Sequence, residues 1–180
     1  MNIETKRFVL RALEPEDASF LASLVNDPEV RDALGAYDLV FPVSVDAETK
    51  WIVEASKKDD QAHLVITKKS DSTPLGLLSL KDLNSRNASG HLSIILERKS
   101  WDKGCGTEVV KGTLEFLFDK MNFHRLWLRV SEGNHRAIRC YEKCGFSREG
   151  MLREDHFAHG GWKNSFIMSV LSEEYRRSGK

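Results

Sequence analysis

The sequence lacks any excess of charge and any long apolar run. Its 27 basic residues balance its 27 acidic residues, so the formal net charge is zero. Because neither sign dominates, we expect no nucleic-acid partner and no binding to a membrane surface. No apolar stretch approaches the length of a membrane-spanning helix, and the first residues contain no signal-peptide core. We therefore expect a cytoplasmic protein.

Cysteine is also scarce, with three residues in 180: Cys105, Cys140 and Cys144. The odd number and the absence of zinc-type spacing favour free thiols in a reducing compartment. Neither Cys105 nor Cys140 has an obvious histidine partner for nucleophilic catalysis. His156 and His159 could supply half a metal site, but no neighbour in sequence completes it. The sequence therefore predicts no metal.

The order of the predicted elements indicates one α/β (α+β) domain over residues 1–180, with helices around a largely antiparallel sheet. Apolar alternation predicts strands, and apolar residues three and four apart predict helices. The predicted strands are 6–13, 63–69, 75–83, 90–97, 125–130, 146–152, 155–159 and 166–171. The predicted helices are 15–25, 30–34, 46–58, 109–121 and 134–143. We expect the charged tail, 172–180, to fray.

A strand, a glycine loop and a helix follow one another between Gly90 and Met121. A helix start carries unpaired N–H groups and partial positive charge, and glycines let phosphate groups approach them closely. The sequence therefore predicts an anion site at the loop Trp101-Asp102-Lys103-Gly104-Cys105-Gly106-Thr107-Glu108. The spacing of Gly104 and Gly106 fits neither a P-loop nor the dinucleotide fingerprint. An ordinary strand-to-helix turn is the alternative interpretation.

A second motif lies in the predicted helix from Asn134. Asn134 and Tyr141 are seven positions apart, so they share one helix face, about 10 Å apart along the axis. An amide and a phenol aligned in this way could contact a long thin ligand at two points. Asn134 is equally suited to be a helix N-cap. Tyr141 lies beside Ala137 and Ile138 on the apolar face, where core packing is as good an interpretation.

Together the two motifs resemble the cofactor site of the GNAT acetyltransferases. The loop is similar to the family's Trp-Gly-Lys-Gly-Tyr-Gly-Thr-Glu, with Asp102 at the first glycine. The segment 134–146 is similar to the family's second motif, with Ala137 in place of a frequent serine. The opening strand and Trp101 resemble the branch that acetylates ribosomal-protein N-termini. The hairpin 161–164 resembles the family's Gly-x-x-Asp, with Asn164 for aspartate.

The resemblance covers nearly the whole chain and implies a fold and a co-substrate. It implies a cofactor cleft between two splayed central strands, filled by acetyl-CoA without a metal. Backbone groups near Ile95 would pair with pantetheine, and a bulge there would direct an N–H group at the thioester oxygen. Tyr141 would protonate the departing thiolate. The implied binding residues are Ile95, Leu96, Glu97, Lys103, Gly104, Cys105, Gly106, Thr107, Glu108, Asn134, Arg139 and Tyr141.

The resemblance also implies direct transfer of acetyl to a primary amine. Such amines are mostly protonated at neutral pH, so a base is needed. Glu97, Glu132 or a water relay could serve, although a solvated surface role is open for either acid. The ribosomal branch implies a protein N-terminal amine as the acceptor. A small amine (polyamine, amino acid or antibiotic) and a non-catalytic CoA-binding module are the alternatives, and a homodimer is an option. The apolar segment 35–45 would cover a core or line a pocket.

Overall fold

The computed structural model describes residues 2–34, 41–158 and 160–177. Eight strands form one sheet in the order β1-β2-β3-β4-β5-β6-β8-β7. Every neighbouring pair is antiparallel except β5 and β6. The strands are β1 (Ile3–Glu4), β2 (Phe8–Ala12), β3 (Ala62–Lys68), β4 (Pro74–Asn84), β5 (Ser89–Leu96), β6 (Arg125–Ser131), β7 (Ser147–Ala158) and β8 (Gly161–Leu171). The predicted mixed, mostly antiparallel sheet is confirmed.

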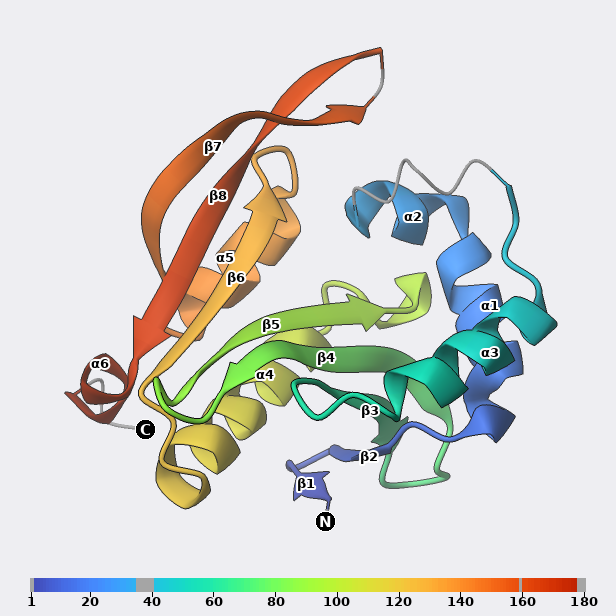
Figure 1. Cartoon of the computed structure of the whole chain (residues 1–180), viewed down its shortest axis with the longest axis horizontal. Helices are drawn as coiled ribbons and strands as arrows, with labels where there is room; N and C mark the ends of the chain where they lie inside the picture. The colour runs from blue at the N-terminus through green and yellow to red at the C-terminus, as the bar shows by residue number, and fades with distance from the viewer. Residues whose placement is uncertain (1, 35–40, 159, 178–180) are drawn as a thin grey trace.

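Helices cover both faces of the first half of the sheet. Val65 and Leu77 pack with the helices on one face, whereas the next residues along each strand, Ile66 and Leu78, belong to the core on the other face. Figure 1 shows α3 in front of the sheet and α4 behind it. The α-helices are α1 (Ala18–Asn26), α2 (Pro28–Leu34), α3 (Val45–Ala55), α4 (Cys105–Glu115), α5 (His135–Lys143) and α6 (Ser172–Arg177), with short helices at Pro15–Asp17, Arg98–Ser100 and Phe116–Lys120.

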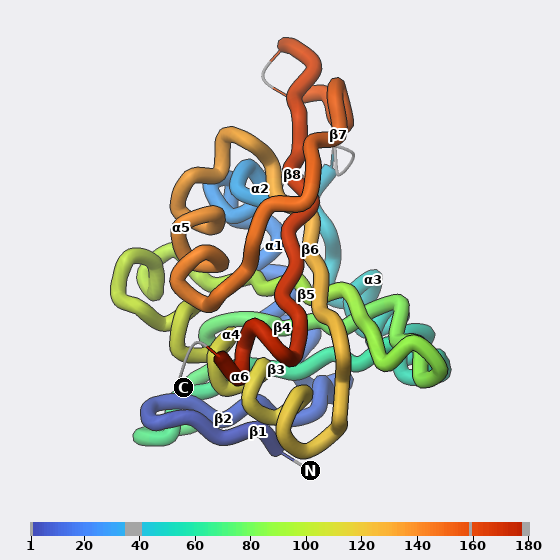
Figure 2. Tube along the Cα trace, turned by 90° about the vertical axis from the view of Figure 1, so that its left-hand side faces the viewer, coloured from blue at the N-terminus to red at the C-terminus, as the bar shows by residue number. Residues whose placement is uncertain are grey.

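The two central strands run parallel and then diverge. They pair only where Ser89–His91 meets Arg125–Trp127. Beyond that point β5 stays with β4 as far as Leu96, and β6 stays with β8 as far as Ser131. Figures 1 and 2 show the resulting separation, with β6 and β8 upright and β2, β3 and β4 lying across the lower part of the molecule. The predicted splay of two central strands is therefore confirmed.

The bulge predicted on β5 lies on β4 instead. On β4, Gly76 pairs with Ile66 and Pro74 pairs with Thr67, which leaves Leu75 as the extra residue. A side-chain Cβ at Gly76 would lie 2.2 Å from the backbone carbonyl oxygen of Ile95. Glycine is therefore the residue that lets β4 approach β5 at this bend.

Several element boundaries differ from the predictions for local reasons. Helix α4 begins at Cys105 rather than 109, because Gly104 adopts a left-handed φ of 70° and ends the loop there. The strands predicted at 146–152 and 155–159 form one strand, β7, with a register shift between Leu152 and His156. The tail does not fray directly after β8, because 172–177 folds as α6 and Tyr175 packs 5.3 Å from the ring of Phe118.

Two further predictions concern the surface. Among the helices of the described ranges, none is long and apolar enough to cross a membrane. The apolar segment 35–45 lies largely outside the described residues. In its described part Phe41 is 80% exposed. The side-chain amide of Asn26 bonds both backbone groups of Val43, at 2.7 and 2.8 Å, which holds this segment against the end of α1.

Candidate active site

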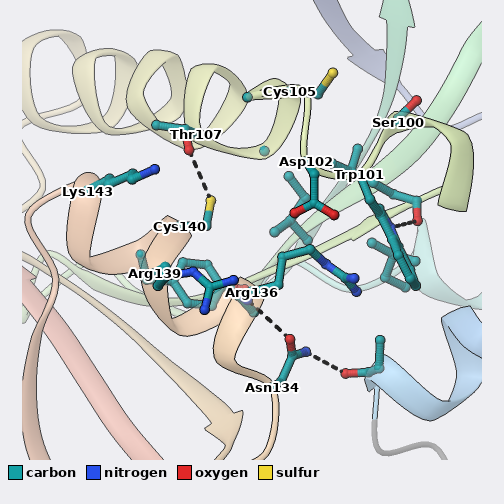
Figure 3. Close-up of a pocket in the computed structure, with 18 of the residues that line it drawn as sticks. Ser100, Trp101, Asp102, Cys105, Thr107, Asn134, Arg136, Arg139, Cys140 and Lys143 are labelled. Carbon is teal, nitrogen blue, oxygen red and sulfur yellow. Dashed lines mark hydrogen bonds between the residues drawn. The ribbon is translucent and has the colours of Figure 1, made fainter.

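A cavity of about 240 Å³ opens where β5 leaves β6. Its walls come from α2, β5, the loop before α4, the first turn of α4 and one face of α5 (Figure 3). The lining includes residues from both sequence motifs: Ile95, Leu96, Gly104, Cys105, Gly106, Thr107, Asn134, Arg139 and Tyr141. The structure thus brings together segments that lie far apart in the sequence.

The first turn of α4 forms one wall of this cavity. The N–H group of Glu108 donates to the carbonyl of Gly104 at 3.1 Å, which closes the first helical turn. The N–H groups of Cys105, Gly106 and Thr107 precede that bond, so they have no acceptor within the helix. These three residues line the cavity. A helix start exposed in this way can bind a phosphate or diphosphate group.

The departure from the glycine pattern at Asp102 has a conformational explanation. Asp102 has a φ of 56°, in the left-handed region that favours glycine. Aspartate tolerates this region better than most residues, because its short side chain can bond to nearby backbone. The loop therefore keeps its shape without the glycine that the family pattern has.

Helix α5 supplies cationic groups that the sequence reasoning missed. Arg136 and Lys143 line the cavity together with the predicted Arg139, and Asp102 is an acid among the lining residues. The guanidinium carbon of Arg136 lies 3.4 Å from the ring centroid of Trp101. Positions 136, 140 and 143 share one helix face, and this spacing could have revealed both cations. The cations suit an anionic ligand.

Strand β5 directs alternate backbone groups into the cleft. The N–H group of Glu97 donates to a β4 carbonyl at 2.8 Å, so Glu97 and Ile95 face β4 through their backbones. The backbones of Ile94 and Leu96 consequently face the open edge. The indole nitrogen of Trp101 donates to the carbonyl of Leu96 at 2.8 Å, which leaves the N–H group of Leu96 for a ligand. The predicted backbone role thus fits Leu96 and Ile94 rather than Ile95.

Tyr141 is both a packing residue and a cavity residue. It is 6% exposed, and its ring lies 5.8 Å from that of Phe146, yet it lines the cavity. Burial raises the pKa of Tyr141, and the neighbouring Cys140 and Cys144 raise it further. The phenol therefore keeps its proton at neutral pH, as a proton donor must.

Asn134 acts as a structural bridge beside the cavity. Its side-chain oxygen accepts from the N–H group of Ala137 at 3.1 Å, which confirms the N-cap interpretation. Its side-chain nitrogen donates to the carbonyl of Ala33 at 2.8 Å and so ties α5 to α2. Each of these two amide atoms has one further bonding position, so a ligand can bond the second N–H hydrogen or the second lone pair of the oxygen.

Comparison with known proteins agrees with this geometry. The family model of the acetyltransferase (GNAT) domain matches residues 7–147. The chain belongs to the GNAT acetyltransferase family. It is an acyltransferase of the acetyl-CoA-dependent N-acetyltransferase type.

Similar GNAT proteins differ in their acceptors. The chain is 26% identical to the spermidine N(1)-acetyltransferase of Vibrio cholerae, over 94% of this chain and 95% of that protein. The crystal structure of the Vibrio cholerae spermidine N-acetyltransferase with CoA and spermine matches with a TM-score of 0.84, at 26% identity, over 94% of this chain and 98% of the other. A putative ribosomal N-acetyltransferase of Bacillus subtilis is 22% identical over 94% of each chain.

Three predicted binding residues of this GNAT chain lie outside the cavity lining: Glu97, Lys103 and Glu108. The carboxylate of Glu97 accepts from the hydroxyl of Ser100 and from the ammonium of Lys99, both at 3.0 Å. Glu97 lines two neighbouring hollows instead. The carboxylate of Glu108 is bound by residues of the β1–β2 turn. These three residues therefore do not contribute to the cavity lining, and their predicted ligand contacts stay predictions.

The second candidate base, Glu132, is also held by the protein. Its two carboxylate oxygens accept from the backbone and side-chain nitrogens of Asn164, at 3.2 and 3.0 Å. These bonds lower the pKa of Glu132. The side-chain oxygen of Asn164 accepts from the N–H group of Glu154 at 2.8 Å. An aspartate at 164 could not donate to Glu132, which accounts for the asparagine at this position.

The three cysteines are free thiols, and two of them contact the first turn of α4. The sulfur of Cys140 lies 3.5 Å from the hydroxyl of Thr107, and the thiol of Cys144 donates to the Thr107 carbonyl at 3.6 Å. Among the described residues, no group of three or more His, Cys, Asp or Glu side chains could hold a metal ion. His159, half of the pair considered from the sequence, lies outside the described residues.

Proposed function

We propose that the protein acetylates a primary amine of a small polyamine-type molecule. The observation that carries this proposal is the likeness to spermidine N(1)-acetyltransferase, which extends over nearly the full length of both chains. The likeness to a solved relative that holds CoA and spermine supports it. The resemblance to the ribosomal branch implies a protein N-terminal amine instead. That acceptor is the second candidate, because a putative ribosomal N-acetyltransferase matches at lower identity.

The cavity suits the elongated, anionic shape of acetyl-CoA. Its diphosphate would accept from the N–H groups of Cys105, Gly106 and Thr107, with Arg136, Arg139 and Lys143 supplying charge. Its pantetheine arm would run along β5 toward the splay, because the backbones of Ile94 and Leu96 face that edge. The residues present thus fit the co-substrate that the family uses.

Residues near the splay would then assist acetyl transfer. The N–H group of Leu96 faces the cleft and is placed to stabilise the oxyanion that forms when the amine attacks the thioester carbon. Collapse of that intermediate breaks the carbon–sulfur bond. Tyr141 would give its phenolic proton to the departing sulfur. No covalent enzyme intermediate is required.

Removal of the proton from the attacking amine is assigned to water rather than to a side chain. Glu97 is bonded to Ser100 and Lys99, and Glu132 is bonded twice to Asn164. Neither carboxylate lines the cavity. A water relay that leads to bulk solvent is therefore the route that the described residues favour.

Direct detection of the acetylated product tests the acceptor. Purified protein and acetyl-CoA would be incubated with a polyamine pool (spermidine, spermine, putrescine) and a pool of ribosomal-type N-terminal peptides, and the products measured by mass spectrometry. Addition of acetyl to the polyamines, lost in the Tyr141→Phe variant, is the expected result. Product only in the peptide pool would refute the polyamine acceptor and favour the protein N-terminal amine. If acetyl-CoA raised the melting temperature but neither pool gave a product, the protein would bind acetyl-CoA and use neither class of acceptor.

Three broader proposals concern the extent of the domain, its location in the cell and its assembly. We propose that residues 1–180 act as one catalytic domain, that the protein works in the cytoplasm, and that a homodimer is its assembly. Size-exclusion chromatography with light scattering measures the last of these. A monomeric mass at micromolar concentration would refute it.

A further inference from the structure

The side of α4 that faces away from the cavity is tied to the N-terminal β-hairpin. The carboxylate of Glu108 accepts from the hydroxyl of Thr5 at 2.8 Å. It also accepts from the backbone and the side-chain Nε of Arg7, at 2.7 and 2.6 Å. A Cβ at Gly112 would lie 2.6 Å from a methyl carbon of Thr5, so the hairpin and the helix are in close contact.

Arg7 holds both ends of the loop that precedes α4. While its Nε donates to Glu108, its two Nη atoms each donate to the carbonyl oxygen of Lys103 at 3.3 Å. Lys103 precedes Gly104, and Glu108 follows Thr107. One guanidinium group therefore spans the segment that carries the N–H groups of residues 105–107.

From this geometry we infer that Arg7 and Glu108 form a buttress that positions the diphosphate-binding loop of the proposed acetyl-CoA site. The inference rests on the proposed function, since it assigns the diphosphate to that loop. Arg7 neither lines the cavity nor reaches the splay, so it is a positioning residue rather than a catalytic one. A loop fixed before binding loses less conformational entropy when the ligand arrives.

The charge of this pair matters as well as its geometry. Glu108 is an acid in the first turn of α4, close to where the diphosphate would bind. Partial burial raises the pKa of Glu108, but the bonds from Arg7 and Thr5 outweigh burial and lower its pKa overall. Arg7 thus neutralises a carboxylate that would otherwise repel the ligand.

Positioning and simple charge neutralisation predict opposite results for two variants. Arg7→Lys keeps the positive charge but cannot donate to Glu108 and Lys103 at once, because an ammonium lacks the planar fork. Glu108→Gln removes a negative charge from the ligand's surroundings but weakens the bonds that hold the loop. If the buttress matters, both variants bind acetyl-CoA less tightly. If only charge matters, Arg7→Lys binds like the natural protein and Glu108→Gln binds more tightly.

Isothermal titration of acetyl-CoA into the full chain tests the inference without depending on the acceptor. We expect about tenfold weaker binding for Arg7→Ala, Arg7→Lys and Glu108→Gln, comparable to the loss of one charge-assisted hydrogen bond. The KM for acetyl-CoA should rise by a similar factor, while kcat at saturation changes less than about twofold. The pair is partly exposed, with side chains 45% and 21% exposed, so the melting temperature should move little.

Lys69→Ala is the matched control. Lys69 lies beside Arg7 and pairs with Glu4 at 2.8 Å, and it is a similarly exposed cation without contact to the loop. This variant should bind acetyl-CoA within about twofold of the natural protein. Natural affinity in Arg7→Lys, or tighter binding by Glu108→Gln, would overturn the buttress while leaving the proposed function intact. Failure of the natural protein to bind acetyl-CoA would overturn both.

Discussion

Replacing Tyr141 with phenylalanine removes one oxygen atom at the point where the proposed mechanism needs a proton. The ring should keep its place, because Tyr141 is 6% exposed and packs against Phe146. Among the described residues no group bonds the Tyr141 hydroxyl, so its loss leaves no protein donor or acceptor unpaired. We therefore expect the free energy of unfolding to change by less than about 1 kcal/mol.

The catalytic effect of the same change should be large. General acid catalysis contributes about 10² to 10⁴ in rate, so kcat should fall by roughly that factor while the Kd for acetyl-CoA stays within about threefold. Because burial raises the pKa of Tyr141, the natural protein should show no loss of rate from its ionisation up to about pH 10. Steady-state kinetics, calorimetric titration and urea unfolding measure the three quantities.

Tyr175→Phe is the matched control for this experiment. It removes the same oxygen atom from a tyrosine on α6, which packs on Phe118 and does not line the cavity. Its kcat should equal that of the natural protein. A Tyr141→Phe enzyme with kcat within about twofold of the natural value would refute the proton-donor role. A large loss of stability would instead show that the hydroxyl is structural.

Three other predictions concern a buried histidine, a cavity thiol and a close backbone contact. Burial, then Lys81 and Lys58, lower the pKa of His63 from 6.5 to about 4. In the folded protein His63 thus binds a proton more weakly than in the unfolded chain. The free energy of unfolding should therefore fall by about 3 kcal/mol as the pH falls from 6.5 toward 4. Urea unfolding at several pH values should show a flatter profile for His63→Gln; an unchanged profile would exclude His63 as the cause. The neighbouring thiol of Cys144 lowers the pKa of Cys140, and Cys140 is the least buried of the three cysteines and lines the cavity. Iodoacetamide should therefore label Cys140 first and acetyl-CoA should slow the labelling, as read by peptide mass spectrometry. Equal labelling with and without acetyl-CoA would place the ligand elsewhere. Gly76→Ala would put a carbon 2.2 Å from a backbone oxygen of β5, and it should lower the melting temperature and weaken acetyl-CoA binding together. An unchanged melting temperature would show that the bend relaxes freely.

Much of the fold could be predicted because its signals are local. Apolar alternation identified β2, turn residues delimited β3, β4 and β5, and the spacing of apolar residues identified α1. The bulge was misplaced because a one-residue shift between β3 and β4 depends on pairing across the sheet. The long β7 was divided because Leu152 to His156 breaks the alternation where the strand changes register.

The backbone groups of the site could be predicted from the sequence, whereas the directions of its side chains could not. Gly104 and Gly106 mark a helix start, whatever surrounds them. The direction of a side chain in a first helical turn depends on distant partners, and Glu108 turned away from the cavity because Arg7, 101 positions earlier, binds it. The cations at 136 and 143 were missed although they share a helix face with Cys140. Arg136 and Lys143 are seven positions apart, the same helical spacing that relates Asn134 and Tyr141.

A crystal structure of the protein with CoA would test the central assignment most directly. We predict that the diphosphate lies against the N–H groups of Cys105, Gly106 and Thr107, and that the pantetheine arm follows β5 past Leu96 toward Tyr141. In such a structure Arg7 should still bridge Lys103 and Glu108. A diphosphate bound away from the start of α4, or a thiol that ends far from Tyr141, would contradict the assignment.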